Sequence, residues 1–227
     1  MRRLRDVIPA PLRRRLRAAV DDFALRVAIR AVQRVPVGAP LPAATIARLQ
    51  RAWGNQGFAA RTEYLAAVCA LALTTHGPIL ECGSGATTLL LAALAGRRGV
   101  EVWSLEHLPA WRDKVVRAAR WISPHATVLL APLRAYGDFE WYTVPPDGWP
   151  RPFEIVVCDG PPWTTQGGRY GLLPVMREHL ADGATILLDD AHRPDEQEVL
   201  RRWQAEGTWS FVVEGTFARV TVPRRGR

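Results

Sequence analysis

The stretch Ile79-Leu80-Glu81-Cys82-Gly83-Ser84-Gly85-Ala86-Thr87-Thr88 joins a short apolar run to two closely spaced glycines and then to a helical pattern. A short apolar run bounded by turn residues is typical of a buried strand. Glycines allow positive φ angles and let the backbone pass close to a ligand. The N–H groups at the start of the next helix can bind a carboxylate or a phosphate. This stretch therefore predicts a strand, a ligand-binding loop and a helix in succession.

Strands and helices alternate in the chain that follows. The expected strands are 78–82, 100–105, 126–131, 153–158, 184–188, 209–214 and 217–222. The expected helices are 87–95, 110–122, 171–181 and 194–206. This alternation predicts right-handed βαβ units and an α/β, Rossmann-like fold around a mainly parallel sheet. The last two strands are separated by only two residues, which predicts an antiparallel hairpin at one edge, and residues 132–152 are expected to form a long loop.

Basic charge is concentrated at the ends of the chain. The net charge is +8, but residues 1–35 hold ten arginines against three acids, and residues 224–227 add three more arginines. The remaining body is slightly acidic, so nucleic acid is not an expected partner. Apolar residues spaced by three and four predict a helix within residues 1–35; they are Leu12, Leu16, Val20, Phe23, Val27 and Ala31. This helix is expected either to pack on the domain or to contact a membrane surface or a protein partner.

The sequence predicts a cytoplasmic protein, with a membrane-peripheral location as the alternative that the basic helix suggests. It contains no apolar run long enough to span a bilayer. Residues 1–6 lack the apolar core of a signal peptide. The three cysteines, Cys69, Cys82 and Cys158, lack metal-binding spacing and are expected to be reduced thiols.

Acidic residues follow several of the predicted strands. Ligands of doubly wound sheets bind beyond the carboxyl ends of the strands. Glu106 ends the second strand, 23 residues after Gly83, where an acid can hold both hydroxyls of a ribose. Asp159-Gly160-Pro161-Pro162-Trp163 follows the fourth strand, and Asp189-Asp190-Ala191-His192 follows the fifth. A tight turn, a solvated acid or a helix cap explains each of them singly, but together they predict a binding site at one edge of the sheet.

The glycine loop could serve a dinucleotide or S-adenosylmethionine. The dinucleotide fingerprint requires a third glycine where Thr88 stands. An acid, Glu81, also lies inside the strand that precedes the loop. Both points favour S-adenosylmethionine, although they leave NAD open.

The pattern Glu81-x-Gly83-x-Gly85-x-x-Thr88 resembles motif I of class I S-adenosylmethionine-dependent methyltransferases. The resemblance covers about residues 55–222. It implies a seven-stranded sheet in the order 3-2-1-4-5-7-6, with the last strand antiparallel and helices on both faces. We expect a basic extension and proline-rich linker at 1–42, the methyltransferase domain with its cap helices at 43–222, and a basic tail at 223–227. The cofactor-binding residues that the resemblance implies are Glu81, Gly83, Ser84, Gly85, Thr88, Glu106 and Asp159.

A narrower resemblance concerns the acids after the fourth and fifth strands. Val157-Cys158-Asp159 and Gly183–Asp190 are similar to the metal-binding segments of catechol-type and macrocin-type O-methyltransferases. This resemblance implies that Asp159, Asp189 and Asp190 bind Mg²⁺, a hard cation that prefers carboxylates and water. Bound metal would lower the pKa of an acceptor hydroxyl and orient its oxygen toward the methyl group.

The catalytic base and the acceptor site are less clearly marked. Catechol-type enzymes place a lysine near the fourth strand, but the sole lysine here, Lys114, follows the second. His192 and Asp159 are therefore the candidate bases. Arg169 and Tyr170 could line the acceptor pocket, or Arg169 could pair with an acid.

The favoured function is O-methylation of a small hydroxylated molecule. One alternative is a metal-independent N-methyltransferase that uses the Asp159-Gly160-Pro161-Pro162 turn, which resembles the Asp-Pro-Pro motif of amino-methyltransferases with an extra glycine. The other is a non-catalytic module that binds a nucleoside-like ligand and reaches a membrane or a partner through its basic helix.

Overall fold

A single seven-stranded sheet forms the centre of the computed structural model, which describes residues 9–54, 60–145, 148–149, 152–207 and 209–224. The strand order is β3-β2-β1-β6-β7-β9-β8, and only the pairings of β9 are antiparallel. The strands are β1 (Ile79–Cys82), β2 (Val102–Glu106), β3 (Ala126–Leu130), β6 (Phe153–Cys158), β7 (Leu180–Leu188), β8 (Ser210–Glu214) and β9 (Phe217–Thr221). This is the predicted 3-2-1-4-5-7-6 order, so the fold prediction is confirmed.

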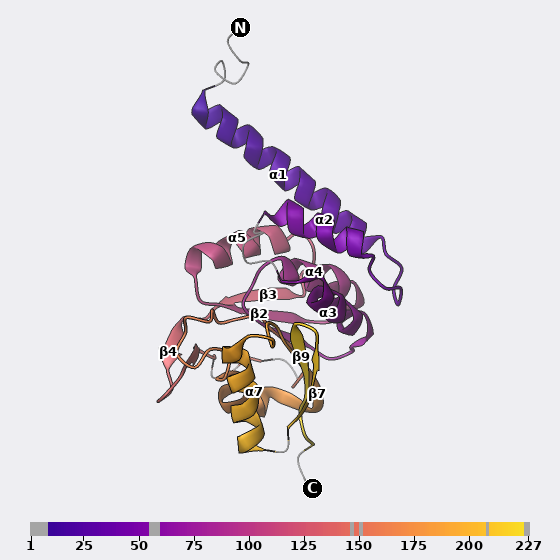
Figure 1. The fold of residues 1–227 in the computed structure, drawn as a ribbon. Helices are drawn as coiled ribbons and strands as arrows, with labels where there is room; N and C mark the ends of the chain where they lie inside the picture. Colours follow the sequence, from indigo (N-terminus) through magenta and orange to yellow (C-terminus); the bar gives the residue numbers. More distant parts are fainter. Residues whose placement is uncertain (1–8, 55–59, 146–147, 150–151, 208, 225–227) are drawn as a thin grey trace.

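Helices cover both faces of the sheet (Figure 1). They are α1 (Ala10–Gln33), α2 (Ala43–Trp53), α3 (Thr62–Thr74), α4 (Ala86–Leu94), α5 (Pro109–Ala119), α6 (Leu172–Met176) and α7 (Pro194–Glu206), with short 3₁₀ turns at Gly96–Arg98 and Arg177–His179. Side chains of a strand alternate between faces. On β1, Ile79 joins the core beneath α1–α5, whereas Leu80 and Cys82 join the core beneath α6 and α7.

Residues 132–152 are not one irregular loop. They contain a two-stranded antiparallel hairpin, β4 (Leu133–Ala135) and β5 (Glu140–Tyr142). The expected long loop is therefore wrong for this part of the segment. Trp141 and Tyr142 on β5 are fully buried in the core beneath α6 and α7, so their bulk stabilises the domain.

Helix α1 packs on the domain through its second half alone. Its buried residues are Leu25, Ala28, Ile29 and Val32. All residues from Pro9 to Ala24 are exposed, and this half of the helix projects away from the body (Figure 1). The apolar series of the sequence does not pack on the domain in this half of the helix, because four of its members are among the most exposed large apolar residues: Leu12, Leu16, Val20 and Phe23.

None of the described helices is both long enough and apolar enough to cross a membrane.

The two halves of α1 should respond differently to truncation of an apolar side chain. Ile29 is fully buried, so Ile29→Ala should lower the free energy of unfolding by about 2–5 kcal/mol. Leu16 is 51% exposed, so Leu16→Ala should change it by only about 0.5 kcal/mol. Urea denaturation of both variants measures the difference; equal losses would contradict the observed packing.

Candidate cofactor and acceptor site

Backbone hydrogen bonds extend the sheet register into the loops at its carboxyl edge. Gly83 N–H donates to the carbonyl of Leu105 (3.0 Å), and Asp159 N–H donates to that of Cys82 (3.1 Å). Asp189 N–H continues the series to the carbonyl of Cys158 (3.0 Å). The loops after β1, β6 and β7 therefore lie side by side, as the sequence predicted.

Two glycines let the loops after β1 and β6 touch. Gly83 has a φ of 87°, which favours glycine. A Cβ atom on Gly160 would lie 3.0 Å from Gly83 Cα and 2.5 Å from the hydroxyl of Tyr142. The Asp159-Gly160 turn thus contacts the glycine loop directly.

Glu81 and Thr88 fix the buried side of the glycine loop through hydrogen bonds. Both are buried. The Thr88 hydroxyl donates to Glu81 Oε2 (2.6 Å) and accepts from Gly85 N–H (2.9 Å), and Ser104 also donates to Glu81. Burial raises the pKa of Glu81 to about 8, although the Ser104 and Thr88 hydrogen bonds oppose this rise. Of the predicted cofactor residues, these two therefore shape the loop from its inner side.

Glu106 ties the end of β2 to the glycine loop. Its Oε2 accepts from the N–H (3.2 Å) and the hydroxyl (2.8 Å) of Ser84, and its Oε1 accepts from Leu108 N–H (2.9 Å). Burial favours protonation, but hydrogen bonds from His107, Leu108 and Ser84 outweigh it and lower the pKa of Glu106. The carboxylate is thus kept ionised at the place where an acid would hold a ribose.

Aromatic side chains border the loop on the α2 side. The Trp53 and Trp111 rings meet edge to face at 5.7 Å, and Lys114 Nζ lies 4.1 Å and 4.4 Å from their centroids. The Trp53 indole N–H is buried without a hydrogen-bond partner among the described residues, and it lies 4.0 Å from where a Cβ of Gly85 would be. A free donor beside the loop suits a ligand acceptor. Residues 55–59, which follow Trp53, lie outside the described residues.

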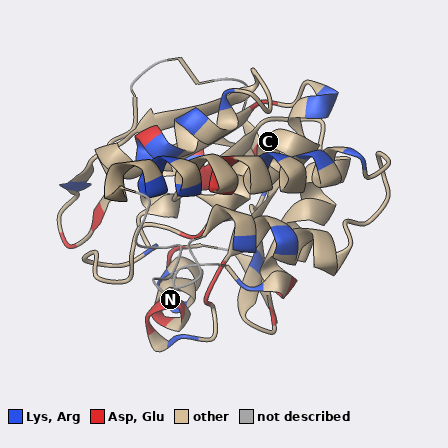
Figure 2. Ribbon diagram, turned by 90° about the horizontal axis from the view of Figure 1, so that it is seen from above, with Lys and Arg blue, Asp and Glu red and all other residues tan. Residues whose placement is uncertain are grey.

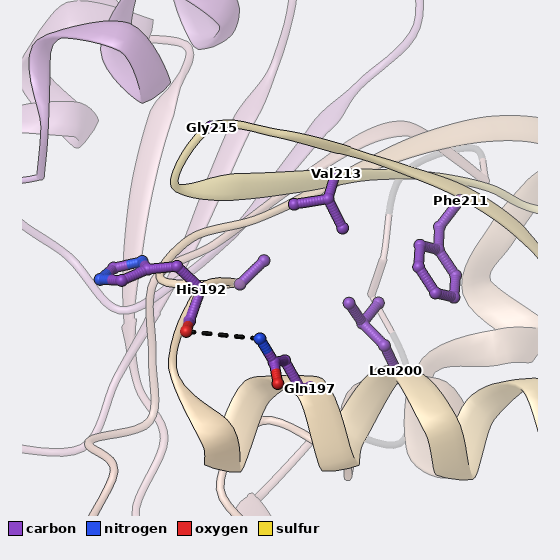
Figure 3. Close-up of a pocket in the computed structure, with 7 residues that line it drawn as sticks. His192, Gln197, Leu200, Phe211, Val213 and Gly215 are labelled. Carbon is purple, nitrogen blue, oxygen red and sulfur yellow. Dashed lines mark hydrogen bonds between the residues drawn. The ribbon is translucent and has the colours of Figure 1, made fainter.

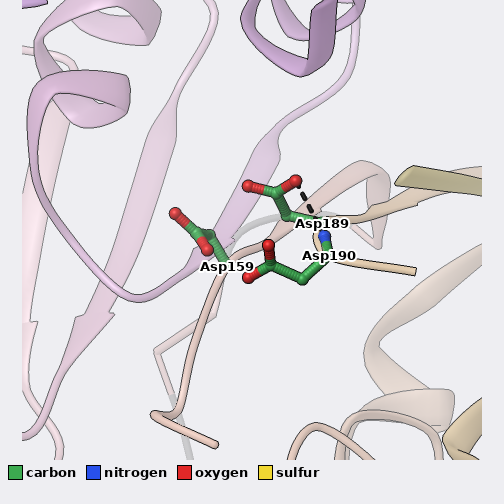
Figure 4. Close-up of side chains that lie close together, drawn as sticks. All are labelled: Asp159, Asp189 and Asp190. Carbon is green, nitrogen blue, oxygen red and sulfur yellow. Dashed lines mark hydrogen bonds between the residues drawn. The ribbon is translucent and has the colours of Figure 1, made fainter. Parts of the chain in front are cut away.

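Three carboxylates meet at the ends of β6 and β7. One oxygen from each of Asp159, Asp189 and Asp190 lies within 4.8 Å of the others, and Figure 4 shows the three side chains next to one another. Asp190 has a φ of 58°, a left-handed conformation that few residues except glycine, Asn and Asp adopt. This local turn places two consecutive acids beside Asp159.

The guanidinium of Arg169 lies among these acids. Its Nη1 donates to the carbonyl of Asp189 (2.6 Å), and its Nη2 donates to Asp159 Oδ1 (3.0 Å) and Asp190 Oδ2 (3.3 Å). Glu196 Oε1, in the first turn of α7, is 3.3 Å from Nη1. Arg169 is only 4% exposed, so it is the buried cation that offsets the charge of the cluster. Of the two predictions for Arg169, the geometry favours pairing with acids.

Two of these acids, Asp159 and Asp189, hold their protons more tightly than free carboxylic acids. Desolvation raises the pKa of Asp159 to about 7; Arg169 opposes this rise, and the neighbouring acids Asp189 and Asp190 add to it. Desolvation likewise raises the pKa of Asp189 to about 6. Asp159 can therefore exchange a proton near neutral pH.

His192 lies on the far side of the Asp189-Asp190 turn. Its ring Nδ1 is 3.4 Å from the carbonyl of Thr216 in the β8–β9 turn, and its own carbonyl accepts from Gln197. It lines a depression of about 420 Å³ between α7 and β8, and its ring points away from Leu200 and Phe211 (Figure 3). The assignment of His192 as a base stays a prediction, and the geometry places Asp159 closer to the glycine loop.

Tyr170 follows Arg169 in the chain, but its side chain does not contact Asp159, Asp189 or Asp190. Its hydroxyl donates to Glu206, and its carbonyl accepts from Trp203 (2.9 Å). Glu206 ends α7, whereas Glu196 begins it, about 15 Å away along the helix. Tyr170 therefore anchors α7, and its predicted contact with a substrate receives no support from this position.

Two charged residues at the site were not singled out from the sequence. Glu196 is 1% exposed and pairs with Arg169, and Arg193 Nη2 lies 3.0 Å from Asp190 Oδ1. Acids at the start of a helix are common, so Glu196 carried no special signal.

The comparisons with known proteins support the fold. No protein-family model matches the sequence, and no curated protein matches it significantly. Among solved structures, an O-methyltransferase from Bacillus cereus in complex with SAH is 17% identical, with 90% of this chain and 97% of that chain covered at a TM-score of 0.50. The C-terminal domain of precorrin-6Y C5,15-methyltransferase from Rhodobacter capsulatus is 14% identical (82% and 100% covered, TM-score 0.52). A methyltransferase from Geobacter sulfurreducens is 11% identical (83% and 91%, TM-score 0.52).

Removing the buried guanidinium of Arg169 should destabilise the domain. Arg169→Met leaves several carboxylates uncompensated and should lower the free energy of unfolding by about 3–5 kcal/mol. Arg193→Met is the matched control: it also removes a partner of Asp190, but its side chain is 46% exposed, so the loss should stay within about 1 kcal/mol. Thermal and urea unfolding of the two variants give the comparison; equal stability would refute the central role of Arg169.

Proposed function

We propose that this chain is an S-adenosylmethionine-dependent methyltransferase that acts on a small hydroxylated molecule. The observation that carries the proposal is the link between Glu106 and Ser84. It sets an ionised acid against a glycine loop at the carboxyl edge of the sheet. The Asp159-Gly160 turn, whose acid has a pKa of about 7, contacts the same loop. The fold it shares with solved methyltransferases supports this reading.

The residues present fit the cofactor. The glycine loop would lie along the cofactor, and Glu106 would accept from the ribose hydroxyls. The Trp53 N–H, which has no hydrogen-bond partner among the described residues, would donate to an acceptor on the part of the ligand near Gly85. When bound, S-adenosylmethionine supplies an electrophilic methyl group on its sulfonium. Asp159 would accept the proton that the acceptor hydroxyl gives up, and S-adenosylhomocysteine would be the product that leaves.

The contacts of the three acids compete with a Mg²⁺ site, because four of their six carboxylate oxygens are already engaged. A metal would need carboxylate oxygens that are free to coordinate it. Asp159 Oδ1 and Asp190 Oδ2 accept from Arg169, Asp190 Oδ1 pairs with Arg193, and Asp189 Oδ1 accepts from the N–H of Asp190. Arg169 thus offers the positive charge that the metal would provide. This arrangement favours a metal-independent reaction over the Mg²⁺ site that the O-methyltransferase resemblance implies.

Cofactor binding should depend on Glu106. Glu106→Gln removes a charged acceptor and should weaken S-adenosylmethionine binding roughly 10- to 100-fold. Glu101→Gln, an exposed acid just before β2, should leave the affinity unchanged. Isothermal titration calorimetry of both variants measures this, with circular dichroism to confirm folding. Equal affinities would remove Glu106 from the binding site.

Methyl transfer should survive a chelator. Transfer of labelled methyl groups from S-adenosylmethionine into a metabolite extract should be the same with EDTA as with added Mg²⁺, because Arg169 provides the positive charge. Asp159→Asn, which cannot accept the proton, should reduce the label to background. Loss of labelling in EDTA with recovery in Mg²⁺ would restore the metal site. Equal labelling by the Asp159 variant would remove it as the base.

A further inference from the structure

The first half of α1 does not pack on the described part of the domain. The fifteen helical residues from Ala10 to Ala24 are all exposed, and they extend about 22 Å beyond the packed half. An isolated helix of this length is marginal in water. A surface that binds one side of this half of α1 would therefore stabilise the helix.

An apolar stripe runs along this free half. It is formed by residues that are spaced by three and four and therefore share one face. Their exposed fractions are large: Leu12 49%, Leu16 51%, Val20 65% and Phe23 67%. The stripe faces away from the domain, because the packed residues Leu25 and Val32 lie on the opposite side of the same helix.

The charged residues nearest to this stripe are arginines. At 3.6 residues per turn, Arg15 and Arg17 flank the stripe, roughly 100° to either side of its centre. Asp21 and Asp22 lie farther round, roughly 140° and 120° from the centre, and Asp22 is already paired with Arg26 (2.8 Å). Figure 2 shows arginines toward both ends of α1 with the aspartates between them. Arginine can keep its stem on apolar material while its guanidinium reaches a polar layer.

This pattern suits an anionic lipid surface better than a second copy of the chain. The first 24 residues contain seven arginines and three aspartates. Pairing two copies through the stripe would bring the flanking arginines together, whereas anionic headgroups would meet them with the opposite charge. The acids lie farther round the helix from that surface than Arg15 and Arg17 do.

We propose that the free half of α1 binds the surface of an anionic bilayer, with Leu12, Leu16, Val20 and Phe23 inserted among the lipids and the flanking arginines at the headgroups. The helix lies in the plane of the surface and holds the domain beside it. This inference is independent of the proposed methyl transfer, since it rests on none of the residues of that site.

Vesicle flotation of the full chain tests this proposal. The protein should float with vesicles of phosphatidylcholine and phosphatidylglycerol, float much less with phosphatidylcholine alone, and be released by salt. A double variant, Leu16→Ser with Phe23→Ser, should bind roughly ten-fold or more weakly. Arg15→Gln with Arg17→Gln should lose the preference for the anionic vesicles.

The matched control removes apolar residues elsewhere on the surface. Val212→Ser with Val213→Ser on β8, exposed by 63% and 48%, should bind like the unaltered chain. The proposal is overturned if the unaltered chain does not float at low salt or if the α1 variants float equally well. It is also overturned if light scattering shows a dimer that the Leu16/Phe23 variant converts to a monomer, since the stripe would then be an interface between copies.

Discussion

The buried guanidinium of Arg169 is the interaction on which the carboxyl edge of this sheet depends. It connects the end of β6 at Asp159, the end of β7 at Asp189 and Asp190, and the start of α7 at Glu196. Without it, several partly buried acids would repel one another or take up protons. The same ion pairs that hold three elements together also decide which carboxylate oxygens remain available to a ligand.

A second constraint, the close approach of Gly83 and Gly160, brings that cluster to the glycine loop. The two halves of the proposed site thus have different origins. Hydrogen bonds from Ser84 and Leu108 keep Glu106 ionised on the cofactor side, whereas desolvation raises the pKa of Asp159 on the acceptor side. Glu106 and Asp159 thus have opposite pKa shifts, and the contact between Gly83 and Gly160 connects the loops that carry them. In the proposed site, Glu106 can hold a ribose and Asp159 can receive a proton.

Much of this fold could be predicted from the sequence, because buried strands and glycine turns leave strong local patterns. The position of the acids at one edge followed from those patterns, whereas the strand order was implied by the resemblance to class I methyltransferases. The β4–β5 hairpin did not follow from the patterns, since three-residue strands are too short for a period to be visible. The sequence also left open how α1 meets the domain: Leu12 and Phe23 belong to its clearest apolar series, but Leu25 and Ile29 make the tertiary contacts. Nothing local to Glu196 indicates its ion pair with a residue 27 positions earlier.

The most direct test of the account is a crystal structure of this chain with S-adenosylhomocysteine. We predict that the ligand lies along the glycine loop with both ribose hydroxyls within about 3 Å of the Glu106 carboxylate. We also predict that the sulfur atom of the ligand faces the Asp159-Gly160 turn. A ligand bound elsewhere, or one whose ribose does not reach Glu106, would contradict the proposed site and the function assigned to it.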